Sequence, residues 1–515
     1  MNSKLRLLAH KLITTIAVLC FSVVSDAETA ASAKPNIVLL YADDFAYWAI
    51  SALGNEIIQT PNLDRLVARG VNFSNAFNMG GWNGAICIAS RSMLISGRSI
   101  WKANDINRRW GENDNAAHSQ TWGRLMSSAG YNTFATGKWH IQADPEQVFG
   151  DTVNINPGGM PPDHLTGTPG LYDRVREAYA KGDDFYALLP PGYNRPLSEA
   201  DNSWTASDPA HNGFWTDGTH WSEVQRADAV NFIDAASESE DPFFLYLAFN
   251  APHDSRQSPL EFLDLYSLED IPLPENWLPE YPYLDEMGDL RVMRDEMLGP
   301  VPRTPYAIRT HIREYYGIIS HLDAQIGLVL QSLEERGLMD NTYIFFTGDN
   351  GLSVGQHGLL GKQNMFDHSI HVPLLAVGPD LPSGKEVSSD IYLQDIMATS
   401  LALAGIQKPD YVDFNSFLDL ANGVASELPL PDGVYGAYMD TQRMIRKDGF
   451  KLVLYPRNRE VLLFDLTADP LEMNDLSDNP QYKEKLSDLF EGLLHLQAQM
   501  EDPLDLLDSF AFLVN

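Results

Sequence analysis

The sequence predicts an α/β protein in which helices sandwich a large mixed, mostly parallel sheet, with a smaller C-terminal α+β subdomain. Two features carry this prediction: apolar runs recur along most of the chain with helical stretches between them, and from about residue 421 the pattern changes to short alternating segments. Near-continuous apolar runs are typical of parallel strands buried on both faces. The runs assigned to buried strands are 36–42, 131–136, 242–249, 342–347 and 371–377.

A long helix is predicted over residues 308–336. Its apolar residues form one stripe, and Gly337 separates it from the strand at 342–347. Strands that alternate with helices favour a sheet whose functional sites gather beyond the carboxyl ends of the strands. The stripe comprises Tyr315, Ile318, Ile319, Leu322, Ile326, Leu330 and Leu333.

Two segments depart from this alternation. Residues 142–221 are rich in Gly, Pro, Trp and Asp, and residues 255–303 are rich in Pro and acidic side chains. Long irregular insertions in a compact domain are usually lids or binding loops, so we expect both near a site. From residue 421 the pattern predicts short antiparallel strands and a final helix: 434–439, 451–455, 461–466 and 481–500.

The chain of 515 residues is long enough for a large domain and a smaller one. We expect a signal peptide at 1–27, a main domain that carries the site at 28–420, and the smaller subdomain at 421–515. The chain has 36 basic and 70 acidic residues, a net charge of −34. Phosphate binding needs a basic footprint, so this charge excludes nucleic acid as a partner.

Residues 1–27 have the form of a secretory signal. A positively charged stretch is followed by an apolar run at 12–24 and by small residues that end at Ala27. The run is short for a transmembrane helix, so we expect export to the periplasm or the medium without stable membrane insertion. Anchoring as a lipoprotein through Cys20 is the less favoured alternative, because the large Leu19 precedes that cysteine.

Cysteine usage draws attention to one residue. Only Cys20 and Cys87 occur, and Cys20 leaves with the signal peptide. The default for a lone thiol is a buried, inert side chain, but a leftover thiol in an exported chain calls for an explanation. A glycine-containing loop at 80–84 precedes Cys87 and an apolar stretch follows it, which predicts a position near a helix N-terminus. There, free N–H groups and a charged donor one turn later, Arg91, favour an anionic ligand.

Acidic side chains follow two of the predicted strands. Asp43 and Asp44 end the strand at 36–42, and Asp349 and Asn350 follow the strand at 342–347. An isolated acidic pair would be an ordinary turn, but two pairs at two strand ends offer four hard oxygen donors. Such donors suit Ca²⁺, and Mg²⁺ is the less favoured alternative because it tends to keep several waters.

Basic residues also stand at strand ends. Lys138 and His140 follow one strand, and their spacing places them on the same side of an extended chain. His253 follows the strand at 242–249, and Lys362 lies beyond the second acidic pair. Each alone would be a surface lysine or a core histidine. Their joint appearance at strand ends indicates one site.

The run from Cys87 to Arg98 resembles the signature of the type I, formylglycine-dependent sulfatases of the alkaline-phosphatase superfamily. The match covers about residues 35–379 and resembles bacterial carbohydrate sulfatases and iduronate-2-sulfatase-like enzymes. It implies an alkaline-phosphatase-like fold, hydrolysis of sulfate esters, and oxidation of Cys87 to formylglycine (3-oxoalanine) by a formylglycine-generating enzyme. Ala89 departs from the usual proline, which leaves the maturing enzyme open. The matching residues are Cys87, Ser90, Arg91, Gly97 and Arg98.

The resemblance also implies a role for each site residue. The ligands of one Ca²⁺ ion would be the modified residue 87 with Asp43, Asp44, Asp349 and Asn350. Arg91 and Lys138 would hold the aldehyde hydrate, and Lys362 would bind sulfate. His253 would protonate the leaving alcohol, and His140 would be the base for breakdown of the hemiacetal.

A sulfated carbohydrate, either a polysaccharide or its oligosaccharides, is the substrate class we expect. Asp254, Arg256 and His357 lie close in sequence to His253 or Lys362, so we expect them to contact the sugar that bears the sulfate. Aromatic residues of the first insertion form either a sugar subsite or loop packing. They are Trp204, Trp215 and Trp221, with His211 and His220 between them.

Two other functions stay open at this stage. A phosphonate or phosphate ester hydrolase of the same superfamily would share the formylglycine. A non-catalytic binder of sulfated glycans would fit if Cys87 stays unmodified.

Overall fold

The computed structural model describes residues 34–161, 170–211, 213–287, 290–428, 430 and 433–514. The predicted signal peptide at 1–27 and Cys20 lie outside the described residues. Residues Pro35–Asn515 form one compact unit. Within the ranges described, no helix combines the length and the apolar character that a membrane crossing requires.

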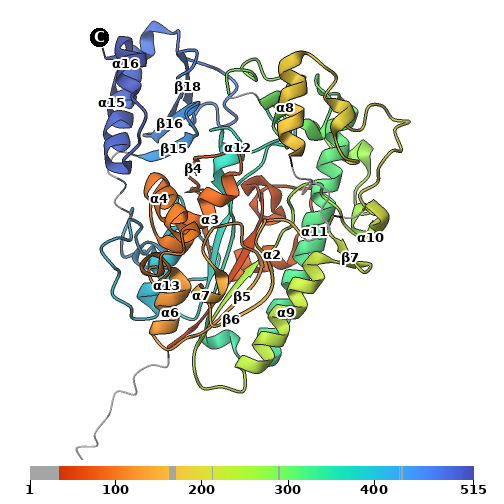
Figure 1. Cartoon of the computed structure of the whole chain (residues 1–515). Coiled ribbons are helices and arrows are strands. Elements are labelled where there is room, and N and C mark those ends of the chain that lie inside the picture. Colours follow the sequence, from red (N-terminus) through yellow and green to blue (C-terminus); the bar gives the residue numbers. More distant parts are fainter. Residues whose placement is uncertain are drawn as a thin grey trace, which may run out of the picture. The chain divides into compact units, whose positions relative to one another are not determined.

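An eight-stranded mixed sheet forms the centre of this unit (Figure 1). Its strand order is β13-β2-β12-β10-β1-β9-β5-β6, and the five strands from β10 to β6 run parallel. The mostly parallel sheet is therefore confirmed. The bounds are β1 Asn36–Ala42, β2 Val71–Phe73, β5 Asn132–Lys138, β6 Asp151–Asn156, β9 Phe243–Ala248, β10 Thr342–Gly348, β12 Leu374–Val377 and β13 Lys385–Val387.

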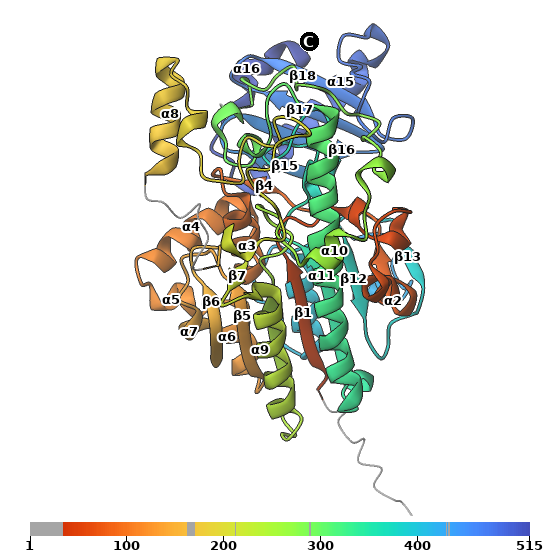
Figure 2. The ribbon, with the colours of Figure 1, turned by 90° about the vertical axis from the view of Figure 1, so that its right-hand side faces the viewer.

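Strand β1 shows why this sheet is buried on both faces. All seven of its residues are buried, and their side chains alternate between two hydrophobic cores. Ile37 and Leu39 join one core, whereas Val38 and Leu40 join the other. Helices cover both faces (Figures 1 and 2): α2 (Pro61–Arg69), α9 (Trp221–Ala236) and α11 (Pro305–Glu335) on one, and α3 (Ile86–Ser96), α4 (Ile100–Gly111) and α6 (Trp122–Ser128) on the other.

The prediction of one parallel strand over 371–377 is wrong. The segment divides at Pro373 into β11 (His371–Val372) and β12, which lie in different sheets. Proline has no N–H to give to a ladder, so the strand breaks there. β12 runs antiparallel to β10 because the chain returns from the carboxyl edge of the sheet without a helical crossover to the opposite edge.

The first insertion is more regular than its composition indicates. β6 (Asp151–Asn156) joins the sheet beside β5 as an edge strand, and α8 (Leu171–Lys181) is a helix of three turns. The predicted long helix begins earlier than expected, at Pro305, because Pro305 occupies its first turn and the Thr304 hydroxyl accepts from the Ala307 N–H.

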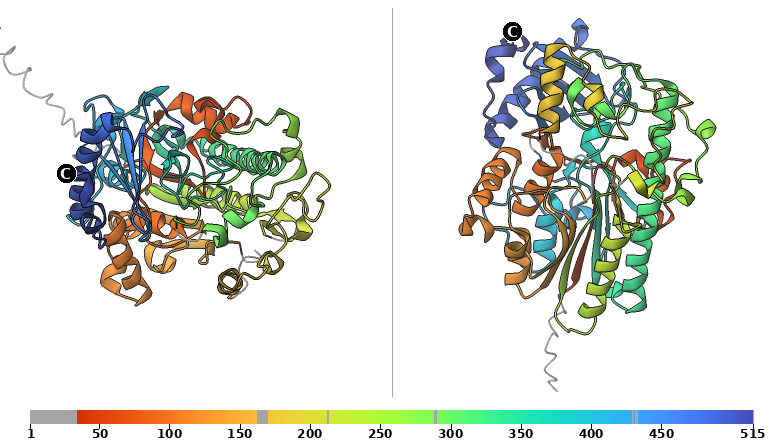
Figure 3. Two further views of the ribbon diagram at one scale, coloured as in Figure 1. Left: turned by 90° about the horizontal axis from the view of Figure 1, so that it is seen from above. Right: turned by 45° about the vertical axis from the view of Figure 1, so that its right-hand side comes forward.

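A five-stranded sheet of order β18-β17-β16-β15-β4 forms the C-terminal part, and α15 (Lys483–Met500) follows it in the chain (Figure 3). The sequence missed β16, because its polar residues QRMIRK show no simple alternation. β4 comes from the segment just before Cys87 and pairs with β15, so the small sheet recruits a strand from the main part. The boundary at 420/421 stays a prediction. The bounds are β4 Gly80–Gly81, β15 Val434–Tyr438, β16 Gln442–Lys447, β17 Phe450–Tyr455 and β18 Glu460–Asp465.

Candidate active site

Four adjacent parallel strands, in the order β5-β9-β1-β10, deliver the predicted residues to one edge of the sheet. Parallel strands end on the same side, so residues that follow each strand meet although hundreds of positions separate them. The Asp44 N–H, after β1, donates to Asp349 Oδ1, after β10, over 3.0 Å. Tyr315 of α11 fixes this turn, because its hydroxyl donates to the Asp44 carbonyl over 2.7 Å.

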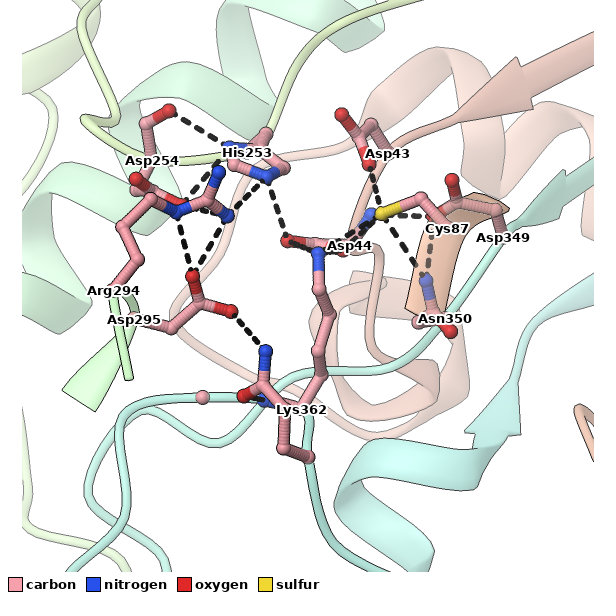
Figure 4. A network of polar contacts seen from close by, with 12 residues as sticks. Asp43, Asp44, Cys87, His253, Asp254, Arg294, Asp295, Asp349, Asn350 and Lys362 are labelled. Carbon is pink, nitrogen blue, oxygen red and sulfur yellow. Dashed lines mark hydrogen bonds and ion pairs between the residues drawn. The ribbon is translucent and has the colours of Figure 1, made fainter. Parts of the chain in front are cut away.

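Cys87 is the second residue of α3, as the sequence predicted, and only 1% of it is exposed. Its thiol donates to Asp43 Oδ1 over 3.3 Å, and Lys362 Nζ lies 3.0 Å from its sulfur (Figure 4). The thiol also lies 3.8 Å from Asp44 Oδ1. The first turn of α3 therefore presents residue 87 directly to the acidic strand ends.

Three carboxylates and the thiol make a compact donor set. One ligand atom each from Asp43, Asp44, Cys87 and Asp349 lies within 4.8 Å of the others, and all four residues are buried. Burial of three carboxylates this close together is costly unless cations compensate them. The oxygen chemistry of the set fits Ca²⁺, which takes carboxylate and amide oxygens in flexible geometry.

Asn350 completes the donor set through its amide. Its Nδ2 lies 3.2 Å from Asp349 Oδ1 and 3.6 Å from the Cys87 sulfur, while Asn78 Nδ2 donates to its Oδ1 over 2.6 Å. Asn78 Oδ1 is buried without a hydrogen-bond partner. A half-turn of both amides keeps the bond between them and directs the Asn350 oxygen at the cluster. This arrangement fits a cation there.

Three buried cations balance the three carboxylates. Lys138 pairs with Asp43, Lys362 Nζ lies 2.5 and 2.6 Å from the Asp44 oxygens, and Arg91 Nε donates to Asp349 over 2.8 Å. Arg91 Nη1 also donates to the Lys138 carbonyl over 2.8 Å, which joins β5 to α3. These three carboxylates and three cations therefore pair one to one. A ligand that binds here would have to replace some of these pairs.

The pKa values follow from burial and from these pairs. Burial by itself raises the pKa of Asp349, but Arg91, Lys138 and Lys362 outweigh it and hold that pKa well below its usual range. Burial raises the pKa of Asp44, against the opposing effect of Lys362. Asp349 is thus ionised at any ordinary pH.

Cys87 is a poor nucleophile as a thiol. Burial raises the pKa of its thiol well above the usual value, and Asp349 adds to the rise, whereas Lys138 and Lys362 oppose it. A thiol must be a thiolate to attack, and reactive cysteines have lowered pKa values. The environment of Cys87 therefore does not activate sulfur, which agrees with a site built for a modified residue.

His253 is held at both of its ring nitrogens. Nδ1 lies 2.9 Å from Asp254 Oδ1, and Nε2 lies 2.7 Å from Arg294 Nη2 (Figure 4). A guanidinium only donates, so Nε2 is the acceptor and the Nδ1–H donates to Asp254, whose carbonyl oxygen is 2.8 Å away. Nε2 also faces Asp44, whose Oδ2 is 3.7 Å away. His253 therefore directs the nitrogen that would serve a leaving group into the site.

His140 lies in the same charged environment. Burial lowers the pKa of its ring well below the usual value, and the charge of Lys138 lowers it further. Its ring packs so close to Gly159 that a Cβ there would come within 2.5 Å of it. The ring is therefore held in its neutral form.

The structure does not bring every predicted residue to the cluster. Asp254 lies beside His253, but Arg256 is only 1% exposed and its Nη1 binds His311 Nδ1 at 3.1 Å in the interior. His357 is 6% exposed and stacks on Phe366, with ring centroids 4.1 Å apart. These partners occupy both side chains away from the carboxylate cluster, so the geometry does not favour them as contacts of the sulfated sugar.

The aromatic residues of the first insertion pack within it. The Arg195 guanidinium covers the Trp204 ring at 3.8 Å, and His211 stacks on its ring with centroids 5.8 Å apart. His220 is buried, and its Nε2 binds the Gln257 carbonyl oxygen at 2.9 Å. Of the two alternatives for this group, the contacts of the described residues favour loop packing.

Sequence reasoning missed several residues of the site. Arg294 and Asp295 come from the second insertion, and Gln363 follows Lys362. Gln363 Nε2 donates to Asp295 Oδ2 over 2.9 Å, and Arg294 Nε donates to Asp295 Oδ1 over 2.8 Å. Residues 294 and 295 follow no predicted strand and belong to no recognised motif. Only the composition of residues 255–303, which predicted an insertion near a site, pointed to this region.

Comparison with known families decides the assignment of this geometry. A family model described as Sulfatase matches residues 35–406, and one described as N-sulphoglucosamine sulphohydrolase, C-terminal, matches residues 355–499. The chain belongs to the sulfatase family. This sulfatase is therefore a sulfuric ester hydrolase, as the run from Cys87 to Arg98 predicted.

Individual relatives extend over most of this sulfatase. An arylsulfatase of Clostridium perfringens is 28% identical, over 88% of this chain and 92% of its own. An N-acetylglucosamine-6-O-sulfatase of Bacteroides thetaiotaomicron is 24% identical, over 95% of this chain and 91% of its own. The solved phosphonate monoester hydrolase of Silicibacter pomeroyi superposes with a TM-score of 0.68 and 19% identity, over 91% and 96% of the two chains. The last likeness confirms the predicted alkaline-phosphatase-like fold.

Proposed function

We propose that this sulfatase hydrolyses sulfate esters on a sulfated polysaccharide or its oligosaccharides, with one Ca²⁺ ion and a formylglycine made from Cys87. The observation that carries the proposal is the convergence of one ligand atom each from Asp43, Asp44, Asp349 and Cys87 within 4.8 Å at the N-terminus of α3. Support for a glycan comes from the N-acetylglucosamine-6-O-sulfatase relative. The N-terminal signal supports export to the periplasm or the medium.

Ca²⁺ would be held by Asp43, Asp44, Asp349 and Asn350 with residue 87, and when bound it polarises the sulfate and neutralises its charge. The hydrate of formylglycine supplies a hydroxyl nucleophile together with a second hydroxyl that allows sulfate to leave. Both groups match the donor chemistry of the buried cluster, which contains hard oxygens around residue 87.

The side chains of this chain orient and protonate the reactants. Lys362, which lies 3.0 Å from the Cys87 sulfur, is placed to hold a sulfate oxygen once a cation takes over Asp44. Arg91 and Lys138, which pair with Asp349 and Asp43 beside residue 87, would hold the oxygens of the modified residue. During the reaction the departing sugar oxygen replaces Arg294 at Nε2 of His253, and the protonated ring donates a proton to that oxygen. His140 takes a proton during release of sulfate.

Exclusion of water supports the same chemistry. Asp43, Asp44 and Asp349 are at most 1% exposed, and so is Lys362. A dry, charged pocket strengthens each interaction with a transferred sulfuryl group. Cations fixed in the pocket also attract a sulfate although the net charge of the whole chain is −34.

Two measurements on one preparation test the proposal. Mass spectrometry of the peptide around residue 87, from a host that contains a formylglycine-generating enzyme, should show that one oxygen has replaced one sulfur and two hydrogens. Rates on 4-nitrophenyl sulfate should exceed those on the phosphate and phosphonate analogues. The variant Cys87→Ala should fold with unchanged circular dichroism and lose turnover.

The phosphonate monoester hydrolase likeness gives the competing assignment a basis. Faster turnover of phosphonate than of sulfate esters would replace the sulfatase chemistry with that alternative. An unmodified Cys87 in a protein that binds sulfated oligosaccharides would indicate a glycan-binding role instead. Desulfation of one defined oligosaccharide among algal and animal sulfated glycans would identify the sugar.

A further inference from the structure

A pocket of about 390 Å³ opens beside the proton donor. Its lining comes from four segments: the loop before Cys87, the start of helix α8, the turn at 292–295, and Gln363. The volume lies in the range of small-molecule sites, about 300–1,000 Å³. The residues used below are Tyr172, Asp173, Arg176, Arg294, Asp295 and Gln363.

The pocket adjoins the reacting atoms through two of these side chains. Arg294 Nη2 lies 2.7 Å from His253 Nε2, the atom that faces a leaving group. Gln363 follows Lys362, and its Nε2 donates to the Gly84 carbonyl, three residues before Cys87, over 3.1 Å. A sulfate held at residue 87 would therefore place its leaving oxygen at His253 and the ring that bears this oxygen in the pocket.

Around the pocket, carboxylates outnumber arginines by one. Arg294 shares its guanidinium between Asp254 Oδ1 at 3.2 Å and Asp295 Oδ1 at 2.7 Å (Figure 4). On α8, Arg176 pairs with Asp173 at 2.5 Å. Of the two arginines in the described lining, Arg294 is held between two carboxylates, Asp254 behind the pocket and Asp295 in its wall, whereas Arg176 forms an exposed surface pair.

We propose that this pocket is the subsite for the sulfated sugar residue, and that it selects a ring without a second negative charge. The inference rests on the proposed sulfatase function and deepens it by naming the substrate class: a sulfated neutral hexose or N-acetylhexosamine. Hydroxyl and amide groups on such a ring exchange hydrogen bonds with Arg294 and Gln363. Tyr172 offers an aromatic surface to its apolar face.

A uronate carboxylate or a second sulfate would meet the opposite situation. Among the described lining residues Arg294 already pairs with Asp254 and Asp295, and the new charge would lie against the charge of Asp295. Like charges brought together at a desolvated site cost several kcal/mol, and every 1.4 kcal/mol is a factor of ten. We expect a preference of at least about 100-fold for the neutral ring on this basis.

Matched substrate pairs test this selection. In one set, methyl hexosides are compared with methyl hexuronides sulfated at the same carbon, which differ only by CH₂OH against carboxylate. In a second set, 6-sulfated N-acetylglucosamine is compared with its N-sulfated analogue. The neutral member of each hydrolysed pair should have the higher kcat/KM by about 100-fold or more. Equal rates, or a faster charged member, would overturn the proposal.

Variants connect the preference to the pocket. Asp295→Asn removes the carboxylate charge in the pocket wall and should lower the ratio of kcat/KM between neutral and charged substrates at least tenfold. Arg294→Lys keeps the positive charge but loses the two-pronged guanidinium, and should raise KM for both substrates. Asp183→Asn removes an exposed carboxylate just beyond α8 and should keep the wild-type ratio. An unchanged ratio in Asp295→Asn would overturn the assignment.

The outcome stays separable from the proposed function. Turnover of 4-nitrophenyl sulfate without turnover of any glycoside would remove the pocket as a sugar subsite but keep the sulfatase chemistry. If no sulfate ester is hydrolysed, the proposed function fails, and calorimetric binding of the same pairs to Cys87→Ala still decides whether the neutral ring is preferred.

Discussion

His253 offers the most discriminating perturbation of this site. The variant His253→Ala removes the nitrogen that faces the leaving group and leaves the sulfur-side contacts of Lys362, Arg91 and Lys138 in place. General acid catalysis contributes about 10²- to 10⁴-fold, which corresponds to about 3–5 kcal/mol at 1.36 kcal/mol per tenfold. We expect a loss of this size for alkyl and sugar sulfates, whose alkoxides leave poorly without a proton.

Activated aryl sulfates should be affected much less, because a nitrophenoxide leaves without protonation. The assay is kcat/KM over a series of sulfate esters of increasing leaving-group basicity, for the wild type and for His253→Ala. The slope against leaving-group pKa should steepen in the variant. Asp254→Asn, which keeps the ring but weakens its hold at Nδ1, is the matched control and should give a smaller change of slope. Parallel lines would refute the assignment of His253 as the proton donor.

Three further predictions concern the metal, the pH dependence and the fold. Ca²⁺ at 100 times its dissociation constant should stabilise the wild type by about 3 kcal/mol, seen as a rise of Tm in scanning calorimetry. The variant Asp349→Asn should lose this Ca²⁺-dependent rise. A rise of equal size in the variant would exclude Asp349 as a ligand. Burial lowers the pKa of His357 to about 4, below the usual value of about 6.5, so the unfolded chain binds a proton first as the pH falls. Stability should therefore decline from pH 6.5 to pH 4 by up to about 3 kcal/mol through this residue. Denaturant unfolding of His357→Asn should lack that part of the decline, and an identical pH profile would contradict it. Gly137→Ala should prevent accumulation of soluble protein, because the Gly137 φ is +94° and a Cβ would lie 2.0 Å from the Ala248 carbonyl oxygen; a soluble variant with wild-type Tm would show that the two strands can separate there.

The sequence predicted the central strands well because their physical signal is local. A strand buried on both faces, such as β1, is apolar throughout, and this pattern is visible without any neighbour. The direction of β12 and the existence of β16 were not predictable in the same way. Pairing direction depends on how the chain returns to the sheet, and β16 is polar and is stabilised by β15 and β17 on either side of it.

The residues of the candidate site also fall into two groups, those that the sequence predicted and those that it did not. Residues that follow strands or stand in the Cys87 signature were visible in sequence, because the end of a parallel strand already specifies an edge of the sheet. Arg256 and His357 were predicted to contact the sugar only because they lie close in sequence to His253 and Lys362. Neighbouring positions can point into the interior: Arg256 reaches His311 while Asp254, two residues earlier, holds His253.

By itself the sequence determined the fold class, the family and the set of residues at the carboxyl edge of the sheet. Tertiary structure alone decided which side chains touch: that three cations balance three carboxylates around Cys87, and that Arg294 from an irregular insertion reaches His253. The reason is physical. Chain periodicity records burial and element type, whereas the partner of a buried charge is set by distance in space, which no local pattern encodes.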